Sequence, residues 1–132
     1  MTTPSIGARI VTEAEFDAAI RLLLRDRKKE MDEIGCVTGP GRSGAIAAVY
    51  ASHILGVPFI PMGAAPPTHL GRLLIIDTAT ETGKTLKKAG VKYRNHSPLI
   101  LAVYHEPPRV MFWYESGKPQ RYRHEASLVV AA

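Results

Sequence analysis

The sequence predicts a single α/β domain over residues 1–132, with a twisted sheet that is parallel, or mixed only at its edge, and helices on both faces. Three observations support this fold class. The length of 132 residues suits one domain. Apolar runs of strand length alternate with segments of helical periodicity along residues 13–114. The run at 73–76 is uninterrupted Leu and Ile, as in a strand buried on both faces of a parallel sheet.

The N-terminal part of the chain predicts a helix, a strand and a second helix. Thr12 and Glu15 form a capping box at the start of a helix over 13–31, in which apolar residues recur at helical spacing. A short apolar run predicts a strand over 33–38. An Ala-rich stretch then predicts a closely packed helix over 43–55.

The remaining elements alternate in the same manner. In chain order they are a strand at 57–62 made irregular by two prolines, a loop at 63–71, a strand at 73–76, a polar turn at 77–83, a helix at 84–90, and strands at 99–104 and 110–114. The core sheet therefore falls within residues 33–114, after an N-terminal helix, and residues 115–132 form a polar, basic tail. Because parallel sheets bind ligands outside the carboxyl ends of their strands, the turns that follow the strands are the candidate sites.

Composition excludes several classes of protein. Hydrophobic residues make up 45% of the chain and charged residues 22%, values that are typical of a folded globular protein. The single cysteine, Cys36, excludes a disulfide framework and a cysteine-rich zinc site. The apolar runs are too short to span a membrane, and the N-terminus lacks the apolar core of a signal peptide. We therefore expect a cytoplasmic protein without membrane contact.

The net charge of +5 is unevenly distributed along the chain. Residues 1–33 contain six basic and seven acidic residues, whereas residues 34–132 contain eleven basic and five acidic ones. This excess indicates an anionic partner, either a phosphorylated small molecule or a nucleic acid, and the alternative is a solvated basic surface. Because no aromatic-basic motif of the RNA-binding kind is present, the sequence does not favour nucleic acid.

Residues 39–44 spell G-x-G-x-x-G between a predicted strand and a predicted helix. A dinucleotide-binding fingerprint also needs an acidic residue about 20 positions further on, and residues 58–67 contain none. Glycine N–H groups, the helix N-terminus and Arg42 nevertheless favour an anion at this turn. A tight turn without a ligand is the alternative.

A second polar turn, at residues 77–85, leads into the next predicted helix. It ends in Thr-Gly-Lys-Thr, as a phosphate-binding P-loop does, but Thr78 stands where that motif requires its first glycine. The pattern therefore supports a polar turn at a helix start, with Asp77 and Glu81 at its two ends.

Together the two turns resemble those of a known family. Residues 73–86 resemble the phosphoribosyl pyrophosphate motif of the type I phosphoribosyltransferases, and the ending Glu-Thr-Gly-Lys-Thr is most similar to the 6-oxopurine branch. The turn at 39–44 and the helix after it resemble the pyrophosphate loop of the same family. The resemblance covers residues 33–114. It implies an enzyme that transfers phosphoribosyl from phosphoribosyl pyrophosphate to a nitrogenous base, such as a purine, and releases pyrophosphate.

The resemblance also implies roles for individual residues. Asp77 and Thr78 would bind the ribose hydroxyls, and Glu81 would exchange a proton with the base, so that Asp77 and Glu81 are the catalytic candidates. The 5′-phosphate would be bound by Thr80, Thr82, Gly83, Lys84 and Thr85. Pyrophosphate would be bound by Gly41, Arg42, Ser43 and Gly44. The aromatic residue that stacks on the base would be one of Phe112, Trp113 and Tyr114.

The family resemblance further implies a homodimer and Mg²⁺, which would be held mainly by the ligand's phosphates, with Asp77 as a weak protein ligand. The sequence departs from the family pattern at two places. Thr78 replaces the second acid of the motif, and the loop at 63–71 is shorter than the family's usual lid. Two alternatives therefore stay open: a non-catalytic regulator of the same fold that binds a phosphoribosyl ligand or nucleotide, and a nucleic-acid-binding α/β module.

Overall fold

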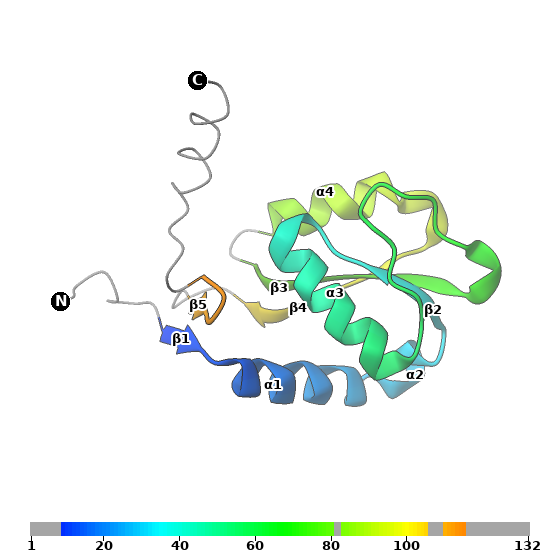
Figure 1. Ribbon diagram of the computed structural model, residues 1–132. Helices are drawn as coiled ribbons and strands as arrows, with labels where there is room; N and C mark the ends of the chain where they lie inside the picture. Colours follow the sequence, from blue (N-terminus) through cyan, green and yellow to red (C-terminus); the bar gives the residue numbers. More distant parts are fainter. Residues whose placement is uncertain (1–8, 81–82, 106–109, 116–132) are drawn as a thin grey trace, which may run out of the picture.

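The computed structural model describes residues 9–80, 83–105 and 110–115 (Figure 1). Within them the main sheet has three parallel strands in the order β2–β3–β4, and a smaller sheet pairs β1 with β5, also in parallel. The strands are β1 (Arg9–Val11), β2 (Ile34–Thr38), β3 (Arg72–Thr80), β4 (Leu99–His105) and β5 (Val110–Phe112). The helices are α1 (Glu13–Arg25), α2 (Lys28–Met31), α3 (Gly41–Leu55) and α4 (Lys84–Lys92), with short 3-10 turns at Thr68–Leu70 and Arg94–His96.

Helices cover both faces of the main sheet, as the sequence predicts. Leu74 and Ile76 of β3 are fully buried on the face that carries α1 and α3, where they join Phe16, Ile20 and several alanines in one apolar cluster. Leu73 and Ile75 are buried on the opposite face, under α4 (Figure 1). Burying each such side chain contributes about 1.5–3 kcal/mol, so the central strand is the best-anchored element of the fold.

The order in which the chain adds strands to the sheet reverses between β2 and β3. From β2, α3 leads to residues 57–60, which lie on the side of β2 away from β3 through a parallel bridge between Val37 and Phe59. From β3, α4 leads the other way, to β4. A reversal of this kind leaves a crevice beyond the carboxyl ends of the two strands, where α/β proteins bind their ligands.

The strand predicted at 57–62 is reduced in the structure to the single bridge between Val37 and Phe59. Val37 donates its N–H to the carbonyl of Pro58 at 2.9 Å and accepts the N–H of Ile60 at 2.8 Å. Pro58 has no N–H to donate toward Gly35, and β2 ends at Thr38, so the ladder does not extend beyond this bridge. Residues 57–60 therefore lie where an edge strand would lie, but they form only this one bridge.

The helix predicted at 13–31 is divided into α1 and α2. Thr12 caps α1 as predicted, because its hydroxyl accepts the N–H of Glu15 at 3.1 Å. The buried stripe of α1 ends at Leu24, and the next buried apolar side chain is Met31. Residues 25–30, which lie between them, are polar and largely exposed. They supply no apolar side chain that would pack a continuous helix against the sheet.

Other element ends differ by a few residues from the prediction. Helix α3 starts at Gly41 rather than at 43, and β3 continues to Thr80, through half of the turn predicted at 77–83. Strand β1 was not predicted, because three residues are too few to show a period. It pairs with β5, which ends at Phe112, and the two lie beyond the end of β4 (Figure 1).

Candidate functional site

Two turns border the crevice between β2 and β3, and both belong to the predicted site. The turn after β2 packs tightly on β3, since a Cβ atom at Gly39 would overlap the carbonyl of Gly44 and crowd the carbonyl oxygen of Ile76. Glycine at this position is therefore what allows the turn to lie directly beside the end of β3. The sequence indicated a glycine-rich turn here, and the close packing against β3 explains why residue 39 is a glycine.

The turn after β2 opens into the first turn of α3. Gly41 adopts a left-handed conformation, with φ of 67°, and the space above its Cα is open. Arg42 is exposed, Ser43 is half-buried and Gly44 is buried. This first turn contains no acidic residue and no side-chain cap, so its N–H groups and the helix dipole favour a negatively charged ligand.

The turn after β3 opens in the same way into α4. Gly83 precedes the helix with φ of 78°, again left-handed, and no side chain caps the first turn, which contains no acid. Lys84 and Thr85 are exposed at this helix start, and Thr80 is half-buried at the end of β3. Glu81 and Thr82, both predicted site residues, lie outside the described part of the chain.

Asp77 and Thr78 lie near the end of β3 and are 8% and 2% exposed. The Asp77 carboxylate accepts the backbone N–H of Thr78 at 2.7 Å and its hydroxyl at 3.5 Å. Burial raises the pKa of Asp77 to about 6, because desolvation outweighs these two hydrogen bonds, which lower it. Asp77 is thus a buried carboxyl group that titrates close to neutral pH at the edge of the crevice.

Tyr114 joins the turn after β2 to strand β3. Its hydroxyl lies 2.8 Å from Ser43 Oγ, at the start of α3, and donates at 3.5 Å to Thr78 Oγ1, near the end of β3. Burial raises the pKa of this phenol, so it is neutral near pH 7. Four predicted residues of different assigned roles, Ser43, Asp77, Thr78 and Tyr114, therefore form one connected group.

The three aromatic candidates differ in their surroundings. Phe112 is 3% exposed, and its ring lies in the core, 6.0 Å from the Phe16 ring and stacked on the Tyr114 ring at 5.6 Å. The Trp113 ring packs 5.7 Å from Phe16. Tyr114 is the candidate whose hydroxyl reaches the turn after β2 and the end of β3. Its contact with Ser43, across 71 residues of chain, has no signal in the sequence.

Comparison with known proteins supports the fold but not a closer relationship. No family model and no curated protein matches the chain. Among solved structures, a purine phosphoribosyltransferase from Pyrococcus horikoshii matches 81% of this chain and 93% of its own, with a TM-score of 0.65 and 21% identity. The xanthine-guanine-hypoxanthine phosphoribosyltransferase of Helicobacter pylori matches 91% of this chain and 97% of its own, with a TM-score of 0.67 and 11% identity. The chain has the type I phosphoribosyltransferase fold.

A third structure of this fold has no assigned activity. It is a hypothetical protein from Neisseria gonorrhoeae that was crystallised with bound ppGpp. It covers 92% of this chain and 98% of its own at 9% identity, with a TM-score of 0.66. The type I phosphoribosyltransferase fold thus extends over nearly the whole described chain.

The site contains few groups that could hold a metal in this phosphoribosyltransferase fold. Among the described residues, no cluster of three or more His, Cys, Asp and Glu side chains could form a metal cage. Asp77 supplies one carboxylate beside the hydroxyl of Thr78. This donor set fits an ion such as Mg²⁺, which prefers phosphate oxygens and water to an all-protein site and needs few protein ligands.

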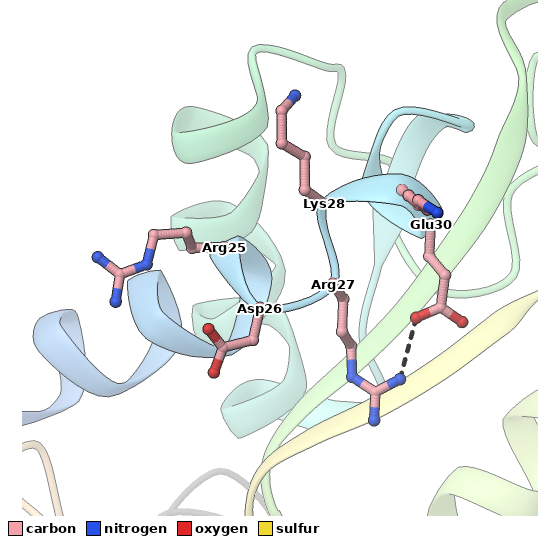
Figure 2. A pocket seen from close by; sticks show the side chains of 6 residues that line it. Arg25, Asp26, Arg27, Lys28 and Glu30 are labelled. Atoms are coloured by element: carbon pink, nitrogen blue, oxygen red, sulfur yellow. Dashed lines mark hydrogen bonds and ion pairs between the residues drawn. The ribbon is translucent and has the colours of Figure 1, made fainter.

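Two basic surfaces lie outside the crevice of the phosphoribosyltransferase fold. One is a pocket between α1 and α2, where Arg27 pairs with Glu30 at 3.0 Å (Figure 2) and Lys28 pairs with Asp32 at 3.2 Å. The other is a groove of about 430 Å³ on α4, lined by Lys84, Lys87, Lys88 and Val91. Residues 83–105 contain five Lys and Arg residues and no acid, so the groove is strongly cationic and begins at the site. Of the helices described, none is long and apolar enough to cross a membrane.

Proposed function

We propose that this protein is a phosphoribosyltransferase. It binds phosphoribosyl pyrophosphate with its 5′-phosphate at residues 80–85 and its pyrophosphate at residues 41–44. The observation that carries this proposal is the connected group of Ser43, Tyr114, Thr78 and Asp77, which links the turn after β2 to the carboxyl-terminal part of β3. The phosphoribosyltransferase fold of the chain supports the same proposal.

Both turns suit anions for the same physical reason. Each leads into a helix through a glycine with left-handed backbone conformation, Gly41 or Gly83. The first turn of each helix has no acidic residue. Backbone N–H groups at such a helix start donate to phosphate oxygens, and the helix dipole adds positive potential. In our proposal Thr80, Thr82, Lys84 and Thr85 bind the 5′-phosphate, and Arg42, Ser43 and Gly44 bind pyrophosphate. The ribose lies between the turns and binds Asp77 and Thr78.

Displacing pyrophosphate leaves a sugar with oxocarbenium character and a leaving group with several negative charges. The protein then contributes mainly by positioning the reactants and by stabilising the anion. The ionised form of Asp77 is suited to accept hydrogen bonds from the ribose hydroxyls and to face the positive charge that develops on the sugar. When bound, Mg²⁺ would neutralise phosphate charge, with Asp77 as its protein ligand.

The acceptor in our proposal is a nitrogenous base, with purines as the first class to test. Tyr114 is the aromatic residue whose hydroxyl reaches the site, so its ring is the first candidate to stack on the base. Glu81 follows Thr80 directly and would exchange a proton with the base. Such general acid–base assistance contributes about 10²–10⁴-fold to turnover.

A second candidate function is a non-catalytic regulator that binds a phosphoribosyl ligand or nucleotide at the same turns. The observation that favours it is Thr78, a buried neutral residue in place of the motif's second acid. The Neisseria gonorrhoeae protein of this fold, crystallised with ppGpp, supports a nucleotide ligand for this alternative.

Calorimetry with phosphoribosyl pyrophosphate, with and without magnesium, tests the shared part of both functions. Ribose 5-phosphate and ribose are the control ligands, because ribose lacks the phosphate that the turn at 80–85 would bind. Pyrophosphate release is then measured over a panel of purine and pyrimidine bases. We expect magnesium-dependent binding, weak or absent binding of ribose, and release of pyrophosphate with at least one base.

Each result separates the candidates. Binding without turnover on any base would favour the regulator, which we would then test with ppGpp. Lack of binding of every phosphorylated ribose would contradict both functions. Once turnover has been measured for the wild-type protein, Glu81→Gln should lower that turnover by about 10²-fold or more, while the affinity for phosphoribosyl pyrophosphate changes little.

A further inference from the structure

The hydroxyl of Tyr114 contacts both the turn after β2 and strand β3. It lies between Ser43, at the start of α3, and Thr78, near the end of β3. The ring is held firmly by its neighbours, because it stacks on the buried Phe112 ring at 5.6 Å and meets the Trp113 ring edge-on at 5.1 Å. The hydroxyl is therefore a fixed bridge between the turn after β2 and strand β3.

Each hydroxyl in this group has one proton, and this decides the direction of the hydrogen bonds. Thr78 donates its proton to Asp77, and Tyr114 donates its proton to Thr78. Either hydroxyl can donate in the 2.8 Å contact between Ser43 and Tyr114, and Ser43 is the donor when Tyr114 donates to Thr78. In that arrangement the hydroxyl proton of Ser43 points at Tyr114 and is not available to an anion at the turn after β2.

We propose that Tyr114 is a positioning residue that couples the turn after β2 to the end of β3, so that a ribose phosphate bound beside Thr78 strengthens the binding of pyrophosphate beside Ser43. This inference rests on the proposed function. A ribose hydroxyl that donates to Thr78 takes the place of the Tyr114 hydroxyl. Tyr114 then donates to Ser43, and Ser43 donates its own proton to the pyrophosphate oxygen. The ribose phosphate breaks the hydrogen bond between Tyr114 and Thr78. Pyrophosphate can then bind Ser43 without having to break that bond itself, which gives positive coupling.

The test is to measure inorganic pyrophosphate binding by calorimetry, in magnesium buffer, with and without saturating ribose 5-phosphate. The ratio of the two dissociation constants is the coupling factor. It is compared between the wild-type protein and Tyr114→Phe, which removes the hydroxyl and keeps the ring. Repulsion between the two anions is the same in both proteins, because the substitution changes no charge.

A matched control is available in Tyr93→Phe. The Tyr93 hydroxyl also forms two hydrogen bonds, accepting from the N–H of Gly63 at 2.7 Å and donating to the carbonyl of Ala64 at 2.9 Å, and neither partner belongs to the site. We expect the coupling factor to be about fivefold larger in the wild-type protein and in Tyr93→Phe than in Tyr114→Phe, the effect of one hydrogen bond. Pyrophosphate alone should bind Tyr114→Phe more tightly than it binds the wild-type protein.

The outcomes distinguish this inference from the function on which it rests. If both ligands bind and Tyr114→Phe keeps the wild-type coupling factor, Tyr114 has only a structural role and the inference is wrong. A loss of coupling in Tyr93→Phe as well would also overturn it, because general loosening would then explain the effect. Failure of both ligands to bind the wild-type protein would remove the proposed function and this inference with it.

Discussion

Asp77 is buried beside Thr78 at the carboxyl end of the central strand, and burial raises its pKa to about 6. In the unfolded chain the same group titrates near its ordinary value of 3.8. Between these two values the folded protein binds more protons than the unfolded chain, so stability falls as the pH rises. The stability contributed by this group is fully present below pH 3.8 and is lost as the pH rises through about 6.

Asp77→Asn should remove this dependence, because the amide keeps an oxygen for the N–H of Thr78 and cannot ionise. At pH 8 we expect the variant to have a free energy of unfolding up to about 3 kcal/mol higher than the wild-type protein. The difference should shrink as the pH is lowered toward 4. Urea denaturation at both pH values measures it, and a difference that is constant with pH would show that Asp77 is ordinarily solvated.

Thr78→Asp restores the second acid that the family motif contains. Thr78 is 2% exposed and adjacent to Asp77, so the substitution would bury two carboxylates side by side. Because their charges repel, the free energy of unfolding of the unliganded variant should fall. In the proposed enzyme, an anionic acceptor for the ribose hydroxyls would strengthen the hydrogen bonds at this position. We expect turnover in magnesium to rise about tenfold, the value of one stronger hydrogen bond to a charged group.

Steady-state pyrophosphate release from the wild-type protein and Thr78→Asp, each with and without magnesium, checks this prediction. Thr85→Val serves as the comparison, because it removes a hydroxyl from the turn after β3 without adding charge. Altered affinity for the ribose phosphate without any turnover would support the regulator instead of the enzyme.

At the scale of elements, the turn between β2 and α3 contains glycines that are needed for different reasons. Gly39 has no room for a Cβ atom, since backbone atoms of Gly44 and Ile76 fill the space. Gly41 has open space around it but a φ of 67°, which L-residues with a side chain rarely adopt. The first glycine is required by packing between elements and the second by the local backbone.

Alanine at these two positions should therefore have different costs. Gly41→Ala should lower the free energy of unfolding by about 1–2 kcal/mol, the cost of a left-handed alanine. Gly39→Ala should lower it by about 3 kcal/mol or more, because rigid backbone must move away from β3. Guanidinium denaturation of both variants measures the difference. Equal losses would mean that the turn after β2 does not pack against β3 as described.

At the scale of the whole molecule, cations are arranged differently at the two ends of the sheet. The pocket between α1 and α2 precedes β2, at the amino ends of the strands. Its Arg27 is paired with Glu30 (Figure 2), and its Lys28 is paired with Asp32. The α4 groove begins at the carboxyl end of β3 and lies in a stretch of the sequence without acidic residues. This asymmetry produces a positive field on the side of the proposed phosphate turn.

The double variant Lys87→Glu and Lys88→Glu should slow the association of phosphoribosyl pyrophosphate about tenfold at low salt, by reducing electrostatic steering. The matched control, Lys28→Glu and Lys29→Glu, makes the same change of charge between α1 and α2 and should slow it much less. Stopped-flow measurements at low and high salt check both, because the difference should vanish when the field is screened. Equal slowing by the two variants would show that only net charge matters.

The sequence by itself determined the fold class, the order of most elements and the two turns at which anions are proposed to bind. These features are local. A buried run such as 73–76, a glycine turn such as 39–44 and a capped helix start at Thr12 each depend on residues close together in the chain. The strand predicted at 57–62 was wrong in part for a local reason, because Pro58 carries no N–H group for a ladder.

Tertiary structure alone decided which of these parts meet. It set the reversal of chain direction between β2 and β3, the pairing of β1 with β5, and the contact of Tyr114 with Ser43 and Thr78. Periodicity and turn chemistry carry no information about contacts between residues as distant as 43 and 114. Such contacts follow from the packing of the whole sheet and its helices, which determines where each strand ends relative to the others.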